Sequence, residues 1–273
     1  MVRCCNSPGK NRSMATMTTT TASFEPPVPQ EMAIPGTHAS VMRLVTRTVP
    51  PSKGIRVLDV GAGQGSLSLK LLEAGYEVSA CDLDPDLFKL RGVECRAADA
   101  AGALPYESQS FDLVVCVEVV EHLESHRRLF VEVRRLLRRQ GRFIFTTPNI
   151  LSLKSRMTFL LSGYYYSYPP LMPQELAPQT QHISPFTLDR YRWTLRRCGL
   201  EIVGVATDKF QRSSLCLSPL WPLVKLYGRV RWGGSPNLAQ QSSPVTLFGR
   251  TLFIIARSHP TSGDWADEGR DAG

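Results

Sequence analysis

The sequence predicts an α/β fold built on a doubly wound, mostly parallel β-sheet. Between residues 55 and 148, short apolar runs alternate with stretches of helical periodicity, which is the rhythm of successive βαβ units. The run from Leu113 to Val117 is apolar at every position, as expected of a central parallel strand covered on both faces. A glycine-rich segment at 61–65 joins the first run to the first helical stretch. Its glycines indicate a tight turn between strand and helix, because such a turn needs residues that can adopt positive φ.

Local patterns predict each element in turn. A helix is expected at 38–47, because Pro50 and Pro51 prevent it from continuing. Within 124–141 the apolar residues recur at helical spacing and Gly141 supplies a stop, so a second helix is expected there. The other expected helices are 66–74, 84–92 and 187–198. The expected strands are 55–60, 76–82, 93–99, 111–117, 142–148, 200–206 and 249–257.

One large domain, residues 36–258, accounts for most of the chain of 273 residues. Residues 1–35 are rich in Thr, Ser and Pro, so we expect a disordered tail there, with a targeting segment as the alternative. Two long segments, 149–183 and 207–248, interrupt the alternation and are interpreted as insertions on the substrate side. Residues 259–273 are expected to form a flexible tail.

Composition and charge narrow the functional class. The formal net charge of +8 permits attraction to nucleic acid or anionic lipid, and it is equally the charge of an ordinary solvated surface. The seven cysteines include no C-x-x-C pair, so we expect neither a disulfide framework nor a zinc cluster, and a cytoplasmic location fits. No apolar run reaches the length of a membrane span. Nothing indicates a DNA partner, and the oligomeric state stays open.

An acid at the entrance of the glycine turn, Asp59, indicates what kind of ligand the turn binds. The turn reads D-x-G-x-G-x-G, whereas a dinucleotide fingerprint would need glycine where Ser66 stands. Because a carboxylate repels phosphate, the turn suits a positively charged ligand better than a pyrophosphate. The predicted ligand-binding glycines are Gly61, Gly63 and Gly65.

With "VLDVGAGQG" and the acids that follow it, the chain resembles the class I methyltransferases that use S-adenosylmethionine, over about residues 55–150. The resemblance implies a Rossmann-like sheet of seven strands whose last strand runs antiparallel, and S-adenosylmethionine as the cofactor. It also implies that the glycine turn and Asp59 surround the amino acid part of the cofactor. Asp82 would then hold the ribose hydroxyls, Asp99 would meet the adenine amino group, and Glu118 belongs to the same cofactor site.

A second motif, E-x-x-E-H, follows the fourth predicted strand and consists of Glu118, Glu121 and His122. It lies at the edge where open α/β sheets bind their ligands. The motif is similar to one in the O-methyltransferases of ubiquinone biosynthesis and in enzymes that 2′-O-methylate the 3′ ends of small RNAs, where it is associated with a divalent metal. His182 matches a further histidine of the RNA enzymes.

Three interpretations of this motif stay open. Glu118, Glu121, His122 and His182 would together bind Mg²⁺ or another divalent cation, because oxygen-rich sites favour hard ions. Without a metal, His122 would be the general base for a substrate hydroxyl, with Glu121 beside it. Alternatively, the acids only stabilise the start of a helix.

The segments after residue 148 should decide the substrate. Tyrosines between 164 and 168 either line an acceptor pocket or belong to a proline-braced loop. Segment 213–232 combines apolar residues with Trp221, Trp232 and three basic residues, so it is expected either to lie on a membrane surface or to form an ordinary broken helix.

The resemblance implies an enzyme that methylates a hydroxyl of a small molecule, such as a quinone, lipid or glycan precursor. Methylation of oxygen is favoured over methylation of nitrogen or carbon. The first alternative is a 2′-O-methyltransferase of RNA 3′ ends, although no RNA-binding module stands out. The second alternative is a non-catalytic protein that keeps the nucleoside pocket as a scaffold.

Overall fold

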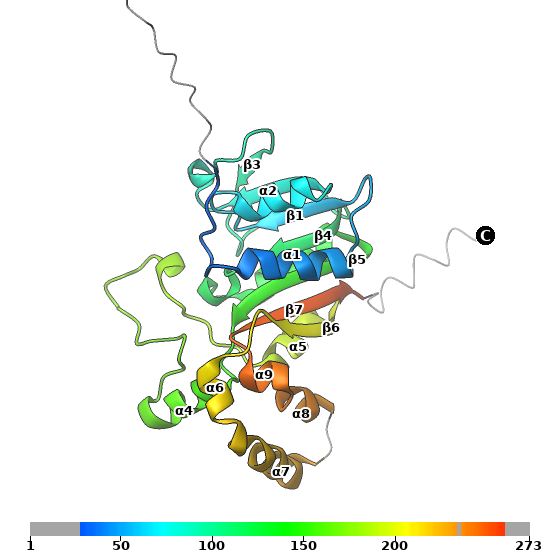
Figure 1. Ribbon diagram of the computed structural model, residues 1–273. Coiled ribbons are helices and arrows are strands. Elements are labelled where there is room, and N and C mark those ends of the chain that lie inside the picture. The colour runs from blue at the N-terminus through cyan, green and yellow to red at the C-terminus, as the bar shows by residue number, and fades with distance from the viewer. Residues whose placement is uncertain (1–27, 234–235, 260–273) are drawn as a thin grey trace, which may run out of the picture.

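The computed structural model describes residues 28–233 and 236–259. Within them, a seven-stranded sheet has the strand order β3-β2-β1-β4-β5-β7-β6 (Figure 1). Strand β7 runs antiparallel to both β5 and β6, and the other neighbouring strands are parallel. The predicted fold class is therefore confirmed. The strands are β1 (Arg56–Val60), β2 (Glu77–Asp82), β3 (Cys95–Ala97), β4 (Phe111–Cys116), β5 (Leu137–Pro148), β6 (Leu200–Thr207) and β7 (Thr251–Ser258).

The helices connect these strands and fill both insertions. The α-helices are α1 (Thr37–Thr48), α2 (Ser66–Glu73), α3 (His126–Leu136), α4 (Leu153–Ser162), α5 (Leu188–Arg197), α6 (Arg212–Cys216), α7 (Trp221–Trp232), α8 (Pro236–Gln241) and α9 (Pro244–Phe248). Short 3₁₀ helices are η1 (Pro85–Leu87), η2 (Val120–His122), η3 (Pro178–Thr180) and η4 (Ser218–Leu220). Among the described residues, no helix is both long and apolar enough to cross a bilayer.

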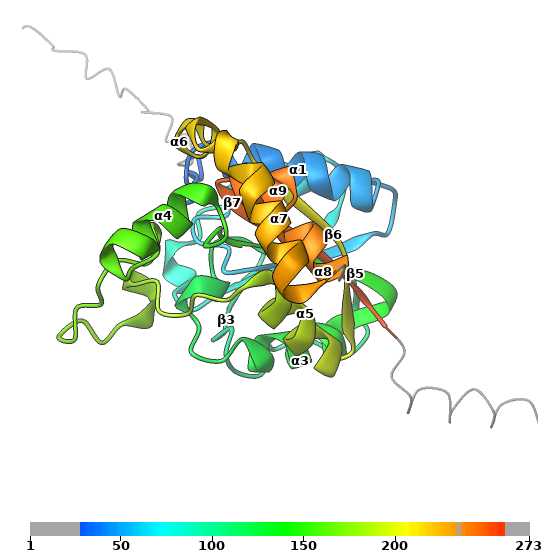
Figure 2. The same cartoon turned by 90° about the horizontal axis from the view of Figure 1, so that it is seen from below.

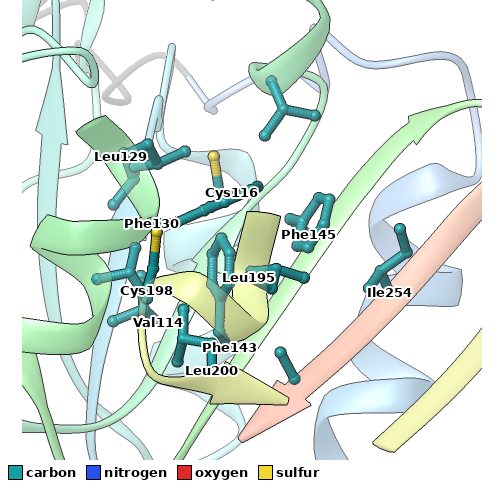
Figure 3. Packing of buried hydrophobic residues seen from close by; sticks show 14 of the residues in the cluster. Val114, Cys116, Leu129, Phe130, Phe143, Phe145, Leu195, Cys198, Leu200 and Ile254 are labelled. Carbon is teal, nitrogen blue, oxygen red and sulfur yellow. The ribbon is translucent and has the colours of Figure 1, made fainter. Parts of the chain in front are cut away.

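Helices cover both faces of the sheet, as a doubly wound fold requires. On one face, α1 and α2 pack against Val57, Leu113 and Val115. On the other face, α3 and α5 pack against a core that includes Val114 and Cys116 (Figure 3). Consecutive residues of β4 thus point to opposite cores, which explains why the sequence of this strand is apolar without alternation.

Two predicted helices differ from the structure. The segment 84–92 forms only the single turn η1, because the side chains of Phe88 and Leu90 both lie against the backbone of Gly65. In an extended backbone the side chains of residues i and i+2 lie on the same side, whereas in an α-helix they point in different directions, so these two contacts require extended backbone.

The helix predicted to run to Gly141 is also shorter than expected. Helix α3 ends at Leu136, and the fully buried Leu137 already pairs with Phe111 in the sheet. Burial of Leu137 and the ion pair between Arg138 and Asp112, at 2.8 Å, favour the strand over another helical turn.

The segment before α1 lies along the carboxyl edge of the sheet and beside the glycine turn (Figure 1). The backbone N–H of Gln30 donates to Gln64 Oε1, and that of Ile34 donates to Glu118 Oε2. Residues 28–35 are therefore placed on the domain, although they were predicted to belong to a disordered tail. The rest of that predicted tail, 1–27, and the C-terminal residues 260–273 lie outside the described residues.

Candidate functional site

A cavity of about 1500 Å³ lies at the carboxyl edge of the sheet. Residues that follow β1, β2, β3 and β4 line it, together with the segment before α1 and parts of both insertions. This is the edge at which open α/β sheets place their ligands. The cavity brings the two sequence motifs, the glycine turn and E-x-x-E-H, into one site.

The glycine turn forms one wall of the cavity. Gly61 and Gly63 line it, and both have positive φ, +75° and +50°. A Cβ on Gly61 would lie 2.3 Å from Val119 Cγ2, so this position excludes any larger residue. Gly65 differs from the prediction: it precedes α2 and contacts Phe88, and it does not line the cavity.

Asp82 and Asp99 line the cavity at the ends of β2 and β3, as predicted. Asp82 Oδ2 accepts a hydrogen bond from Gly63 N at 2.7 Å, and its Oδ1 accepts one from Asp84 N at 2.9 Å. Asp99 Oδ1 accepts from Ala101 N at 2.8 Å. Asp82 therefore fixes the glycine turn against the end of β2 while it faces the cavity.

Asp59 does not contact the cavity, contrary to the prediction. Its side chain is buried behind the glycine turn, where Oδ2 accepts a hydrogen bond from Ser68 Oγ at 2.7 Å. Burial raises the pKa of Asp59 to about 6, although the Ser68 hydrogen bond opposes this shift. Asp59 ties β1 to α2 and so supports the turn from behind.

Glu118 lines the cavity in a left-handed conformation, with φ of +53°. The backbone N–H of Glu118 donates a hydrogen bond to the hydroxyl of Thr146 at 2.8 Å, and the carboxylate of Glu118 accepts one from Ile34 N at 3.3 Å. Burial raises the pKa of Glu118 above its ordinary value, and the Ile34 hydrogen bond and the charge of Arg250 oppose this shift. Glu118 thus joins the N-terminal segment to the glycine wall.

Glu121, His122 and His182 form a cluster whose ligand atoms lie within 4.8 Å of one another. The carbonyl of Gln181 lies 2.8 Å from His122 Nδ1, and the carbonyl of Ser167 lies 2.6 Å from His182 Nδ1. Since a carbonyl only accepts, Nδ1 is the donor in each of these contacts. Carbonyls orient metal-binding imidazoles in the same way.

Glu121 is the buried member of this cluster, with 1% of its surface exposed. Burial raises the pKa of Glu121 to about 8; a backbone hydrogen bond opposes this shift, and the charge of Glu118 is a smaller cause in the same direction as burial. Its Oε2 atom has no hydrogen-bond partner among the described residues, which is rare for a buried carboxylate. A cation or a hydroxyl donor in the cavity would satisfy it.

The predicted four-residue metal set is therefore reduced to three. Glu118 stands apart from the cluster, because its left-handed backbone directs its carboxylate to Ile34 N and not toward His182. The prediction had assumed a helical turn after β4 that would place both glutamates on one face.

The sequence interpretation missed several residues that line the cavity. Four are cationic: Lys154, Lys209, Arg212 and Arg250. They come from α4, the loop after β6, the start of α6 and the residue before β7. No motif or spacing marked them in advance, because the fold alone brings these separate segments together.

Comparisons with known proteins agree with this architecture. A family model described as a methyltransferase domain matches residues 36–205, more than half of the chain. The ubiquinone biosynthesis O-methyltransferase of Xylella fastidiosa is 30% identical over 177 residues, which are 61% of this chain and 69% of the relative. The enzyme of the same name from Xanthomonas oryzae is 35% identical over 105 residues, 35% of this chain and 44% of the relative.

A solved structure with the same fold is that of an S-adenosylmethionine-dependent methyltransferase from Archaeoglobus fulgidus. Its TM-score is 0.51 at 19% identity, and the match covers 81% of this chain and 95% of that chain.

Proposed function

Because the chain belongs to the methyltransferase family, we propose that it transfers a methyl group from S-adenosylmethionine to a hydroxyl of a small-molecule acceptor. The observation that carries this proposal is one cavity with two chemically distinct walls. The first wall consists of the glycine turn with Asp82 and Asp99, and the second contains Glu121, His122 and His182. A donor on the first wall would present its methyl group to an acceptor on the second.

The first wall fits S-adenosylmethionine in charge and in shape. This molecule carries positive sulfonium and ammonium groups and no phosphate, and three acids, Asp82, Asp99 and Glu118, line the wall. Gly61 and Gly63 have no Cβ atom, so their backbone leaves room for a ligand to approach the turn closely. A carboxylate at the end of the second strand also suits the two ribose hydroxyls.

Methyl transfer needs the acceptor hydroxyl to lose its proton as the oxygen attacks. The sulfur–methyl bond breaks, the oxygen–methyl bond forms, and the sulfonium becomes a neutral thioether. His122 lines the cavity, and its Nδ1 donates to the carbonyl of Gln181, so Nε2 would be the ring atom that accepts the proton. Because the donor is already activated, in-line positioning of the two substrates would supply most of the remaining rate.

A divalent cation fits the same cluster. Glu121 Oε2 has no partner among the described residues, and each histidine is oriented by a backbone carbonyl. Glu121, His122 and His182 would hold the ion, which when bound acidifies a coordinated hydroxyl.

The acceptor class is supported by the relatives from Xylella fastidiosa and Xanthomonas oryzae, which are ubiquinone biosynthesis O-methyltransferases. We propose a hydroxyl on a quinone, lipid or glycan precursor as the acceptor. The RNA alternative also uses a downstream histidine, and His182 belongs to the cluster, so an RNA acceptor is tested beside the small molecules. A cytoplasmic location is part of the same proposal.

Labelled S-adenosylmethionine, incubated with the protein and a cell extract separated into lipid, glycan, small-molecule and RNA pools, tests this function. We expect the label in a hydroxyl compound outside the RNA pool, and we expect His122→Ala to slow transfer by about a hundredfold or more. If EDTA stops transfer by the wild-type protein, the cluster acts through a metal; if EDTA has no effect, His122 acts as the base. No label in any pool would contradict the function, and label in RNA alone would favour the alternative.

A further inference from the structure

The cavity has an uneven charge distribution. Its acids Asp82 and Asp99 lie at the ends of β2 and β3, on one side of the sheet. Its cations lie on the other side: Lys154 follows β5, Lys209 and Arg212 follow β6, and Arg250 precedes β7. Four strand spacings separate β2 from β7 in the sheet, which corresponds to about 20 Å. The acidic wall, with Asp82 and Asp99, and the basic wall, with Lys154, Lys209, Arg212 and Arg250, are therefore opposite ends of one elongated site.

Three of the cations have no carboxylate partner in the described part of the chain. Arg250 is different, since it forms an ion pair with Asp208. Lys154, Lys209 and Arg212 form no such pair, although all three line the cavity. Lys154 Nζ lies 3.1 Å from the centroid of the Tyr166 ring, a contact that holds the ammonium group at the cavity wall.

The described carboxylates that line the cavity are those of Asp82, Asp84, Asp99, Glu118 and Glu121, and none of them forms an ion pair with Lys154, Lys209 or Arg212. The positive groups of the donor match the acids at the other end of the site. Its one anionic group, the carboxylate of the amino acid part, is expected beside the glycine turn and so does not reach these cations. The basic wall instead calls for an anionic partner.

From this arrangement we infer that the methyl acceptor carries an anionic group, a carboxylate or a phosphate, that binds to Lys154, Lys209 and Arg212 while its hydroxyl reaches the Glu121–His122–His182 cluster. This inference rests on the proposed function and names the substrate class. Tyr166 and Phe210 line the same wall and offer flat apolar surfaces to the body of such an acceptor.

Three catechols that differ in charge test the inference: 3,4-dihydroxybenzoate, catechol and dopamine. Calorimetry measures their affinities for the protein saturated with S-adenosylhomocysteine. We expect 3,4-dihydroxybenzoate to bind about tenfold more tightly than catechol, and dopamine to bind most weakly, because each partly exposed ion pair contributes modestly. Inorganic phosphate and acetate as competitors distinguish the two anionic groups.

The triple variant Lys154→Gln/Lys209→Gln/Arg212→Gln should lose this preference and keep its affinity for S-adenosylhomocysteine. The matched control Arg43→Gln/Lys53→Gln/Arg128→Gln removes the same charge outside the cavity and should keep the preference. Equal binding of the three probes, binding of none, or the same loss in the control would overturn the inference. Failure of S-adenosylhomocysteine itself to bind would instead overturn the proposed function.

A second inference rests on a different observation, the outer face of α7. Four apolar side chains there are exposed at helical spacing: Leu223 (61%), Leu226 (61%), Tyr227 (64%) and Val230 (79%). The opposite face packs on the domain through Trp221 and Val224. Trp221 Nε1 donates to the carbonyl of Ser242 at 2.9 Å, so Trp221 does not serve as the exposed anchor that the membrane interpretation of 213–232 assumed. Trp232 is 62% exposed.

Basic residues flank the exposed stripe, and the helix carries no acid. Arg229 lies on one side and Arg231 on the other, as the angular spacing of an α-helix places them. Lys225 lies further round the helix, with its Nζ 4.4 Å from the centroid of the Trp221 ring. Leu160 and Leu161, 74% and 81% exposed on α4, lie at the same end of the molecule (Figures 1 and 2). We propose that α7 docks this end on an anionic lipid membrane, because an apolar stripe between cations suits the interface between headgroups and acyl chains.

Co-sedimentation with vesicles of phosphatidylglycerol and phosphatidylcholine tests the docking. We expect binding that falls at least tenfold in Leu226→Asp/Val230→Asp and that falls again when phosphatidylglycerol is omitted. The control Val131→Asp changes a side chain of α3 that is 42% exposed and should bind as the wild type does. Unchanged binding in the double variant would overturn the proposal, as would a dimer in solution that the double variant dissociates.

Discussion

Replacing Asp82 with alanine is expected to weaken the binding of S-adenosylhomocysteine by about a hundredfold or more, and to abolish methyl transfer at ordinary donor concentrations. The carboxylate lines the cavity and also accepts hydrogen bonds from Gly63 N and Asp84 N. The change removes a charged acceptor for two ribose hydroxyls, each worth about 1.5–3 kcal/mol. It also releases the glycine turn from the end of β2. Calorimetry on the purified variant measures the loss.

Asp86→Ala is the matched control, because Asp86 lies on the same connection and does not line the cavity. It should bind S-adenosylhomocysteine as the wild type does. Thermal unfolding of both variants separates a lost contact from a lost fold. Wild-type affinity in a folded Asp82→Ala protein would show that Asp82 only shapes the turn, and the donor would then need a different set of contacts.

The sequence predicted those parts of the fold that depend on local pattern. Most apolar runs became strands close to their expected limits, as in 200–206 against Leu200–Thr207, whereas β5 begins at Leu137 and not at the expected residue 142. The glycine turn was equally local, since positive φ at Gly61 restricts the residue type whatever surrounds it. The segment 84–92 depended instead on distant contacts of Phe88 and Leu90 with Gly65, which its helical pattern did not reveal.

The site was predictable to the same extent. Glu121 and His122 follow a strand within a recognisable motif, and both lie in the cavity. The direction of the Glu118 side chain depends on the left-handed backbone of Glu118 itself and on the hydrogen bond that Ile34 N donates to its carboxylate. Neither feature has a sequence signature. Asp59 was predicted to contact the ligand from its charge and from the family resemblance of the motif, but its burial in β1 places it behind the turn.

The stability of the protein between pH 4 and 8 is expected to depend on two buried groups that act in opposite directions. His126 is 1% exposed, and its ring lies among Phe130, Phe186 and Tyr191, with centroid distances from 3.9 to 6.1 Å. Neither ring nitrogen has a well-formed hydrogen bond among the described residues, and a weak contact with the backbone of Val120 only partly opposes the effect of burial. Burial is the main cause that lowers the pKa of His126 from 6.5 to about 4.

The sign of the His126 effect follows from proton uptake. Between pH 6.5 and 4 the unfolded chain binds a proton at this residue that the folded chain does not, so the free energy of unfolding falls as the pH falls. The full effect is about 3 kcal/mol. Glu121 acts in the opposite sense: with a folded pKa of about 8 against an ordinary 4.5, its folded form holds the extra proton, so stability falls as the pH rises through that window.

Two variants separate these effects. His126→Phe should leave the Glu121 effect, so this protein becomes more stable as the pH falls from 8 to 4.5. Asp59, with its pKa raised to about 6, contributes in the same direction at the lower end of that window. Glu121→Gln should keep the His126 effect, so the free energy of unfolding of this variant should fall as the pH falls from 6.5 to 4. The smaller, opposite contribution of Asp59 reduces this fall.

Urea unfolding at pH 4.5, 6.5 and 8 measures the free energies. If Glu121→Gln were equally stable at pH 4.5 and 6.5, His126 would be protonated or partnered in the folded protein, and the apolar surroundings of its ring would need another explanation. A divalent cation bound to Glu121 would itself abolish the Glu121 effect, because the carboxylate would then stay ionised in the folded state. The same titration with added Mn²⁺ therefore reports on the cluster independently of any methyl transfer.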